Sequence, residues 1–557
     1  MKNGLLPLVF ASALLSGSAL AADLDTKLLA RPEAAEAKSS LGETGFGENI
    51  DLRTGSTSFS YTDVSIPVSD ALAVQFGRKL ALTSDYFDHY APTIDNWSNS
   101  PTSGIQWERM ILGLHWEADL PFMRGIYDAR TGWVSTPLLG SSASTTSRCS
   151  ASFEPPTVQG VSPFHSQPFK SSQYWGGIQI NLPGRGERSL VRLANTAPTP
   201  QDGRTYVGGT AAKDRIACLP SLKNGAGEGF LLVAPDGTKF YFDWIAVRHR
   251  GPLVSGATFT SSVGGSPPEF SLPQTMLPLV DAYIFATRIE DRFGNWVAYE
   301  YDAANPFRLI EITSSAQAKL SFEYNAGGQL QSVSAGSRTW TYGFDANRVL
   351  TSTTLPDGRA WSYTPVSSLM TLFNATEADA RKLQKACVVD LGTMRSSSAP
   401  ESFDVAEFAV TTPSSARARF VLREIVHGTN NAPGSCQHIQ NSRSTGPGTT
   451  QIWWETLVEG APLLNRVVAI SSKDVEGPGA PLRTWRYQYE PSWSYASQCA
   501  SGACGNSSKT IVTSPGQIET HYTFGNDFQS NLGLLLEVST RVGPAIARQT
   551  VTQYVQG

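Results

Sequence analysis

The sequence predicts an all-β fold in which short β-hairpins repeat and stack beside one another. Three observations support this prediction. Aromatic and polar residues alternate in several short runs, tight-turn sequences separate these runs, and charged residues make up only 17% of a chain with 49 Gly and 34 Pro. Alternation at every second position indicates strands with one buried face, and Gly and Pro concentrate in turns. The 557 residues are enough for roughly three or four domains.

The first 21 residues have the pattern of a secretory signal peptide. Lys2 precedes an apolar run over residues 5–15, and the small-residue sequence ALA at 19–21 forms a cleavage site before Ala22. A membrane anchor is the weaker alternative, because the apolar run is short. We therefore expect export to the periplasm, the cell surface or the medium, with no integral membrane segment after cleavage.

Two regions are expected between the signal peptide and the main repeats. Residues 22–138 should form an N-terminal β region. Residues 139–228 should form a Ser-, Pro- and Gly-rich connection that carries further β segments. Within it, residues 139–174 are rich in Ser, Thr and Pro, which indicates irregular structure.

Residues 229–364 contain the clearest repeated hairpins. The stretch DRFGNWVAYEYDAANPFRLIEI, at 291–312, holds a turn signal, an aromatic strand ending in Tyr-Asp, and a second apolar strand. Tyr301, Tyr324, Phe344 and Tyr363 recur at spacings of 23, 20 and 19 residues. One hairpin alone is barely stable in water, so such units must stack to share an apolar face. An ordinary β-sandwich is the alternative, because regular strands with turns also suit that fold.

The alternation assigns a set of aromatic side chains to the buried face and two Pro-Asp-Gly sequences to tight turns. Asp236 with Gly237 and Asp357 with Gly358 should form the turns, because Gly tolerates the positive φ that a tight hairpin needs. The expected core aromatics are Phe240, Phe242, Tyr299, Tyr301, Phe322, Tyr324, Trp340, Tyr342, Phe344, Trp361, Tyr363, Trp485, Tyr487, Tyr489, Tyr522 and Phe524.

Two further regions follow the repeats. Residues 365–450 should be an insertion with irregular loops and one helix near 374–386, because Asn374 with Glu377 three residues later forms a capping box. Residues 451–557 should contain more hairpins. A repeat array usually finishes with an atypical capping unit. None is recognisable here, so we expect the array to be unfinished.

Six cysteines, an even number, favour disulfide bonds in an exported protein. Cys499 and Cys504 lie close enough in sequence to close a small loop, and they are the best candidate pair. The other four allow three pairings, between which the sequence does not choose: Cys149, Cys218, Cys387 and Cys436.

The repeated units resemble the tyrosine–aspartate (YD) repeats of the rearrangement-hotspot (RHS) family. The family pattern is roughly Tyr-Asp, two residues, Gly-Arg-Leu and a second strand. YDAANPFRLIEI, YNAGGQLQSV and FDANRVLTST each keep part of it. The segment 49–80 is similar to the opening segment of such proteins, with Asp-Val-x-Ile-Pro followed by an Arg, although Val68 stands where a Gly is expected. The similarity covers 49–80, 229–363 and 482–555, under half of the chain.

This resemblance implies a scaffold function. In the RHS family, long arrays coil into a hollow β shell that encloses a C-terminal toxin or protects it during delivery. We therefore expect a curved, partial β shell that acts in intercellular competition. Its partner would be a toxin cargo, or a second chain or further C-terminal segment that completes the shell.

No catalytic, cofactor-binding or metal-binding residue is assigned from the sequence. G-x-S-x-G, H-E-x-x-H and P-loop motifs are absent. His115, Glu117 and Asp119 share one strand face, but three ligands from one short strand rarely converge on a metal. A second cluster is interpreted as a solvated turn, because paired carboxylates hydrolyse glycosides only at a defined separation. It consists of Asp85, Asp88 and His89.

Charge and composition leave two alternative functions. The net charge of -4, from 44 basic and 48 acidic residues, provides no electrostatic footprint for nucleic acid. A secreted or surface module that binds carbohydrate or protein through its long loops is one alternative. A hydrolase that uses the His115 or Asp85 cluster on a β scaffold is the other. We therefore expect a non-catalytic protein without a cofactor.

Overall fold

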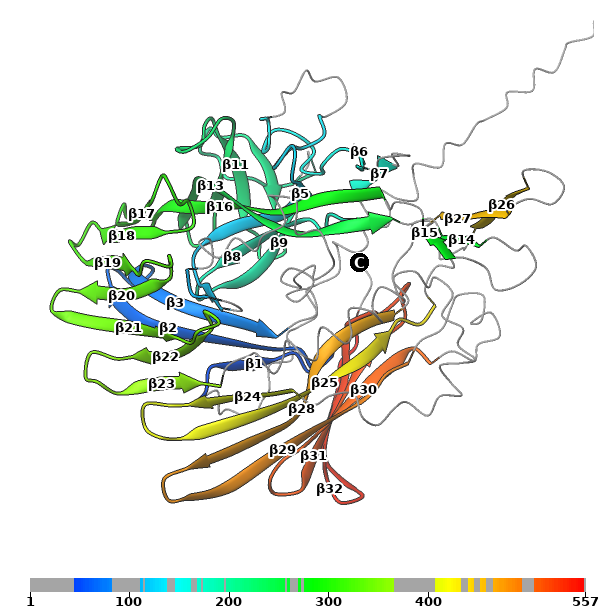
Figure 1. Cartoon of the computed structure of the whole chain (residues 1–557). Coiled ribbons are helices and arrows are strands. Elements are labelled where there is room, and N and C mark those ends of the chain that lie inside the picture. The colour runs from blue at the N-terminus through cyan, green and yellow to red at the C-terminus, as the bar shows by residue number, and fades with distance from the viewer. Residues whose placement is uncertain are drawn as a thin grey trace, which may run out of the picture.

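The computed structural model describes the greater part of the chain between residues 45 and 554. The described ranges are 45–82, 111–113, 116–137, 146–161, 168–171, 174–194, 197–255, 258–260, 269–271, 275–364, 406–431, 439–444, 451–456, 464–492 and 505–554. All elements within them are β-strands (Figure 1). The predicted all-β class is thereby confirmed for this part of the chain. The helix expected near 374–386 lies outside the described residues.

An N-terminal sheet of four antiparallel strands is built from the segment that resembles the family's opening sequence. Its long hairpin joins β2 to β3, with a register shift between Thr62 and Val64. The strands are β1 (Glu48–Ile50), β2 (Thr57–Pro67), β3 (Ala73–Leu82) and β4 (Trp116–Ala118), paired in that order.

Eight strands close into a ring, because β16 uses both of its edges. One edge pairs with β13 along its length, and the other pairs with β5 from Leu279 to Phe285. The ring runs β5-β8-β9-β10-β11-β12-β13-β16 and back to β5. Its strands are β5 (Phe122–Asp128), β8 (Ile178–Leu182), β9 (Gly186–Arg192), β10 (Tyr206–Gly209), β11 (Arg215–Leu219), β12 (Gly229–Val233), β13 (Lys239–Ser255) and β16 (Thr275–Glu290).

The sheet leaves this ring at the end of β16, where residues 288–290 pair with β17 instead of β5. From there each strand pairs with the next described strand of the ladder, and we call this continuous antiparallel sheet the repeat sheet. Its strands are β17 (Trp296–Tyr301), β18 (Leu309–Ser314), β19 (Lys319–Tyr324), β20 (Leu330–Ala335), β21 (Arg338–Phe344), β22 (Leu350–Thr354), β23 (Ala360–Tyr363), β24 (Ala406–Thr411), β25 (Arg417–Gly428), β28 (Leu464–Gly477), β29 (Ala480–Glu490), β30 (Ser507–Thr513), β31 (Ile518–Gly525), β32 (Leu535–Val542) and β33 (Ala545–Val551).

Three short strand pairs lie outside these sheets. They are β6 (Val158–Gln159) with β7 (Pro168–Phe169), β14 (Thr258–Thr260) with β15 (Glu269–Ser271), and β26 (Ile439–Ser444) with β27 (Gln451–Thr456).

The repeat sheet curves around the N-terminal sheet, which lies against its concave side (Figure 1). Phe59 on β2 packs against Phe408 and Phe420, with ring centroids 4.8 Å from each. Phe76 on β3 packs edge-on against Phe322 at 5.1 Å. Of the sixteen core aromatics expected from the sequence, all are buried except three that are partly buried and pack against the core: Tyr324, Phe344 and Trp361.

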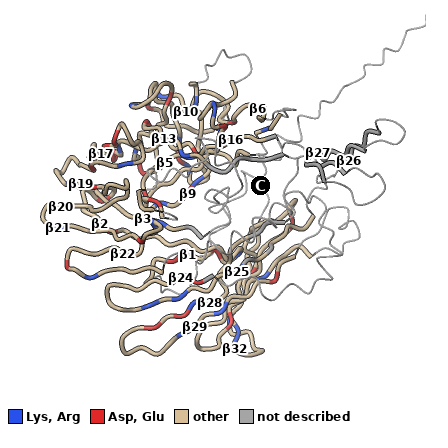
Figure 2. Tube along the Cα trace, in the orientation of Figure 1, with Lys and Arg blue, Asp and Glu red and all other residues tan. Residues whose placement is uncertain are grey.

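Charged residues of both signs are interspersed along the strands of the repeat sheet (Figure 2). Arg419, next to the buried Phe420, forms ion pairs with Glu407 and Asp474 on the neighbouring strands. Opposite charges on adjacent strands stabilise such a face modestly. The alternation along each strand therefore separates an aromatic concave face from a solvated convex one.

Several repeat tyrosines bond to the backbone of an earlier strand. The Tyr324 hydroxyl accepts from the Leu309 amide at 2.9 Å and donates to the Leu309 carbonyl at 2.8 Å. The Tyr301 and Tyr489 hydroxyls donate in the same way, to the carbonyls of Ala286 and Ile470. The tyrosine therefore links consecutive units and satisfies backbone groups that the strand ladder leaves over.

The aspartate that follows Tyr301 or Phe344 closes the turn of its own unit. Asp302 Oδ1 accepts from the Ala304 amide at 2.8 Å, and Asp345 Oδ1 accepts from the amide of Val349 at 2.9 Å. The two Pro-Asp-Gly turns follow the same rule, and Gly237 and Gly358 have φ values of 85° and 84°. Asp side chains stabilise such turns because they mimic a backbone turn.

Candidate functional site

The contact between the N-terminal sheet and the repeat sheet holds a group of buried polar residues that includes Arg78, which is 0% exposed. Arg78 on β3 donates from Nε to Asp63 Oδ2 on β2 at 2.9 Å and from Nη2 to Asp63 Oδ1 at 3.0 Å. Their side chains are 0% and 2% exposed. The register shift after Thr62 lies at Asp63 and accompanies this pairing. Burial by itself lowers the pKa of Arg78, but the Asp63 carboxylate outweighs it, and the pKa is raised.

Aromatic rings surround the Arg78 guanidinium. Its carbon lies 4.6 Å from the ring centroid of Tyr61, 5.2 Å from Trp116 and 5.0 Å from Tyr363. Arg78 Nη1 makes no hydrogen bond, and the π faces of these rings offset part of that loss. Three aromatic rings therefore surround this buried charge in place of water.

The repeat sheet contributes a direct hydrogen bond to this ion pair. The Tyr342 hydroxyl on β21 donates to Asp63 Oδ2 at 2.9 Å. Burial raises the pKa of the Tyr342 phenol, so its proton stays in place. The ion pair therefore joins the two sheets as well as the two strands of its own hairpin.

A second ion pair and a polar contact extend this interface. Glu48 on β1 pairs with Lys473 on β28, and both side chains are buried. The ammonium of Lys473 lies 5.1 Å from the ring centroid of Trp485. Ser69, in the β2–β3 turn, donates to Asp291 Oδ2 at 2.8 Å in the turn that begins the first repeat. Ionic and polar contacts therefore span the N-terminal sheet from β1 to the β2–β3 turn.

Glu117 belongs to an ion-pair network. Glu117 Oε1 accepts from Arg248 Nη2 at 2.8 Å, and the same nitrogen donates to the Tyr283 hydroxyl at 2.6 Å. Burial would raise the pKa of Glu117, but Arg248 lowers it overall. Asp119 bonds a different partner, the Asn181 amide, at 3.0 Å. The two carboxylates are therefore committed to separate partners.

No group of three or more His, Cys, Asp or Glu side chains in the described ranges is placed to hold a metal ion. His115, the third member of the Glu117 cluster, lies outside those ranges. The second cluster considered from the sequence also lies outside them: Asp85, Asp88 and His89.

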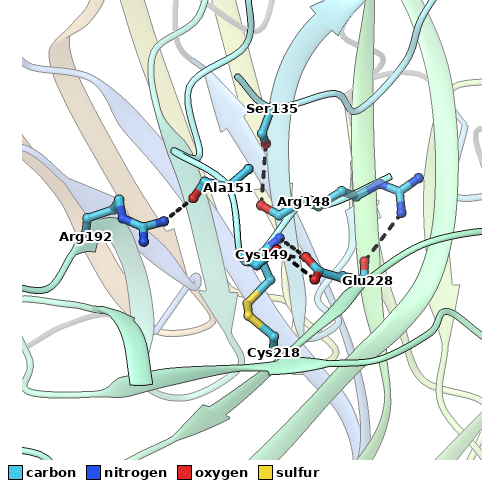
Figure 3. The surroundings of a disulfide bond; sticks show 8 residues. Ser135, Arg148, Cys149, Ala151, Arg192, Cys218 and Glu228 are labelled. Carbon is cyan, nitrogen blue, oxygen red and sulfur yellow. Dashed lines mark hydrogen bonds between the residues drawn. A yellow bond between two sulfur atoms is a disulfide. The ribbon is translucent and has the colours of Figure 1, made fainter. Parts of the chain in front are cut away.

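Cys149 and Cys218 form a disulfide that ties a loop to β11 of the ring (Figure 3). Their Cα atoms are 5.4 Å apart, and 69 residues separate them in sequence. The Glu228 carboxylate accepts from the backbone amide of Cys149 at 2.9 Å. The sequence left three pairings open for Cys149, and the structure selects this one. Four cysteines lie outside the described residues: Cys387, Cys436, Cys499 and Cys504.

The far end of the repeat sheet is exposed. Every residue of β33 is exposed, and its described ladder partner is β32 alone. Ile546 and Val551 are 50% and 63% exposed. Exposed strand edges with apolar residues readily pair with another strand. Tyr554, just beyond, donates to the Leu535 carbonyl at 3.0 Å, as other repeat tyrosines do.

The described part of the chain contains no helix long and apolar enough to cross a membrane.

The Asp63–Arg78 pair was not predicted as a site, although the sequence carries a signal for it. Val74, Phe76 and Leu80 occupy alternate positions of β3 and are fully buried. Arg78 falls on the same face. A charged residue at a buried position of a period-two pattern requires a partner, and Asp63 is the acidic residue of the neighbouring strand's motif.

Comparison with known proteins identifies the repeat. The family model described as RHS Repeat matches residues 324–360, the stretch from the end of β19 to the start of β23. No curated protein matches the sequence. The solved structure titled "Crystal Structure of TcdB2-TccC3" matches at 10% identity with a TM-score of 0.17, over 90% of this chain and 24% of that one. A TM-score this low does not support an inference about the fold of this chain. The chain corresponds to 24% of the length of the matched chain.

Proposed function

We propose that this RHS-repeat protein is an exported, non-catalytic scaffold that forms part of a β shell, working with a toxin cargo or a second polypeptide in intercellular competition. The observation that supports this most is the continuous curved repeat sheet from β17 to β33, which wraps its aromatic face around the N-terminal sheet (Figure 1). A curved sheet with one packed face and one solvated face that carries both charge signs is suited to form the side of a shell.

The buried ionisable groups also support a structural role. Lys473 with Glu48 and Arg248 with Glu117 form ion pairs between different sheets, and Arg78 with Asp63 joins the two strands of one hairpin. A catalytic acid or base needs a group that can change its protonation state near neutral pH. These Arg, Lys and carboxylate groups are paired with one another, and the pairs orient the strands that carry them.

A partner that completes the shell has a place to dock at β33. Its exposed edge can accept a strand that continues the ladder, from a second chain or from a further segment. The Cys149–Cys218 bond supports export, because disulfides persist in oxidising compartments.

Native mass spectrometry of the protein purified from the cells that make it tests this proposal. We expect a complex heavier than the 60.0 kDa chain, containing a second polypeptide that resists added protease until the complex is unfolded. A species with the mass of the processed chain alone, with no protected polypeptide, would contradict the scaffold. If that lone chain bound immobilised glycans, the surface-binding alternative would replace it.

A further inference from the structure

β33 is the open end of the repeat sheet. At its other end the sheet continues into the ring, because β17 pairs with residues 288–290 of β16. Among the described strands, β33 pairs with β32 alone. The repeat sheet therefore presents one free strand edge. Edge pairing between the repeat sheets of two copies has to use β33 twice, so it closes at a dimer and builds no fibre.

The same end of the sheet gathers exposed apolar side chains. Nine large apolar side chains are exposed among the described residues, and five of them lie between residues 518 and 554. These five are Ile518, Val542, Ile546, Val551 and Tyr554. Exposed apolar side chains that concentrate in one place mark a surface that a partner covers. The free edge therefore lies within the most apolar part of the described surface.

The hydrogen bonds to β32 determine which backbone groups of β33 face outward. The Thr552 amide donates to the Leu536 carbonyl at 2.9 Å, and these two residues lie directly opposite each other in the register of β32 against β33. In an antiparallel ladder, pairs that exchange hydrogen bonds alternate with pairs that direct their backbone groups to the other side. Thr550 therefore bonds to β32, whereas the N–H and C=O groups of Gln549 and Val551 point to the free edge.

These outward groups are self-complementary about Thr550. When two copies of β33 lie antiparallel with their Thr550 residues opposite each other, Gln549 of each copy lies opposite Val551 of the other. Each of these two pairs exchanges two backbone hydrogen bonds. Opposed threonines form favourable cross-strand pairs. The same register brings Ile546 of each copy to the level of Tyr554 of the other, so exposed apolar side chains cover each other.

Charge does not oppose this contact. Arg548 is the only charged residue of β33. In the register centred on Thr550 it lies opposite Thr552, and the two copies of Arg548 are offset by roughly 14 Å along the strands. That distance exceeds the Debye length of about 8 Å at physiological salt, so their repulsion is largely screened.

We propose that β33 is a homotypic docking strand, through which two copies of this chain join their repeat sheets edge to edge into one antiparallel sheet with a two-fold axis at Thr550. The inference rests on the proposed function, and it identifies the chain that docks at β33 as a second copy. One side of the shell then contains both repeat sheets.

Two substitutions at Gln549 test the free edge separately from the rest of the strand. Gln549→Pro removes the outward N–H and keeps the bonds to β32, because proline is tolerated where the N–H of an edge strand faces solvent. Gln549→Val is the matched control, since it keeps the N–H on a strand-forming residue. Sedimentation velocity of the full-length chain should show a monomer–dimer equilibrium for the wild type and Gln549→Val. Gln549→Pro should weaken dimerisation at least about tenfold, because each dimer loses two backbone hydrogen bonds.

Cross-linking tests the register and does not depend on the folding of the proline variant. Opposed residues of a pair that exchanges no backbone bonds have Cα atoms about 4.5 Å apart, which suits a disulfide. Thr550→Cys should therefore form a disulfide-linked dimer under mild oxidation, identified by non-reducing peptide mapping. Gln549→Cys is the control, because the two copies of position 549 are diagonal neighbours about 7–8 Å apart, beyond the reach of a disulfide.

The homotypic contact would be overturned by a wild type that stays monomeric over the concentration series, or by association that continues beyond the dimer. Dimerisation of Gln549→Pro as strong as that of the wild type, or equal cross-linking at positions 549 and 550, would also overturn it. The proposed function fails on a different result, the absence of a protected second polypeptide. A complex that holds a different polypeptide and gives no Thr550→Cys cross-link would overturn the dimer and leave the shell in place.

Discussion

At the scale of single residues, Arg78 shows how the interface accommodates a charge. The guanidinium is removed from water, a change that costs several kcal/mol for an isolated ion. Asp63 returns much of this through two hydrogen bonds, and the rings of Tyr61, Trp116 and Tyr363 surround the rest. Asp63 and Arg78 could both be recognised in the sequence. Their contact could not be predicted, because it depends on the register of β2 against β3.

Arg78→Met tests this buried pair. The variant leaves the Asp63 carboxylate buried with Tyr342 as its remaining side-chain donor. Breaking one side of a buried pair costs about 3–5 kcal/mol. We expect the free energy of unfolding to fall by about that amount, measured by urea denaturation followed through tryptophan fluorescence.

The double variant Asp63→Leu with Arg78→Met supplies the control. It removes both charges and replaces them with apolar groups, which is often neutral at buried sites. Most of the lost stability should return. A double variant as unstable as Arg78→Met would show that Arg78 acts through packing against its rings and not through the charge pair.

At the scale of the repeat unit, the tyrosine of the Tyr-Asp pattern connects neighbouring units by hydrogen bonds. The last ladder pairs of β18 with β19 leave Leu309 beyond them, since Glu311 pairs with Ser321. The Tyr324 hydroxyl then satisfies both backbone groups of Leu309. The hairpins themselves were predictable, because period-two alternation and turn residues are local signals. The tyrosine bond was not, since it joins positions fifteen residues apart.

Tyr324→Phe tests this link between units. The variant keeps the ring and removes the hydroxyl, so the Leu309 carbonyl and amide both lose a partner. We expect a loss of about 1–3 kcal/mol in the free energy of unfolding, measured as before. Tyr299→Phe is the matched control, because no hydrogen bond joins its hydroxyl to a described residue, and it should cost less. Equal losses of stability at both positions would show that the hydrogen bonds of Tyr324 to Leu309 do not contribute more than an ordinary buried hydroxyl.

At the scale of the whole molecule, the closed ring is the feature that the sequence concealed. β5 and β16 pair although Asp128 and its partner Leu279 are far apart in the chain. Local sequence patterns do not indicate such pairings. The ring combines strands from three regions that the sequence analysis treated separately: 22–138, 139–228 and 229–364. The fold class and the repeat sheet followed from alternation, whereas the ring and the position of the N-terminal sheet depend on non-local contacts.

The exposed edge of β33 leads to a prediction about association of the whole chain. β33 combines an open strand edge with Ile546 and Val551, and it has few of the charges or prolines that protect natural edges. We expect the purified chain to self-associate as its concentration rises. The double variant Ile546→Lys with Val551→Lys should weaken that association by at least about tenfold, since losing about 1.4 kcal/mol of apolar burial suffices.

Sedimentation velocity over a concentration series measures this association. Leu482→Lys is the matched control, because Leu482 is 62% exposed but lies on β29, away from the β33 edge. Only the β33 variant should remain monomeric at concentrations where the wild type associates. If Leu482→Lys suppressed association equally, general surface hydrophobicity would explain the self-association. The proposal that a partner strand docks at the β33 edge would then be contradicted.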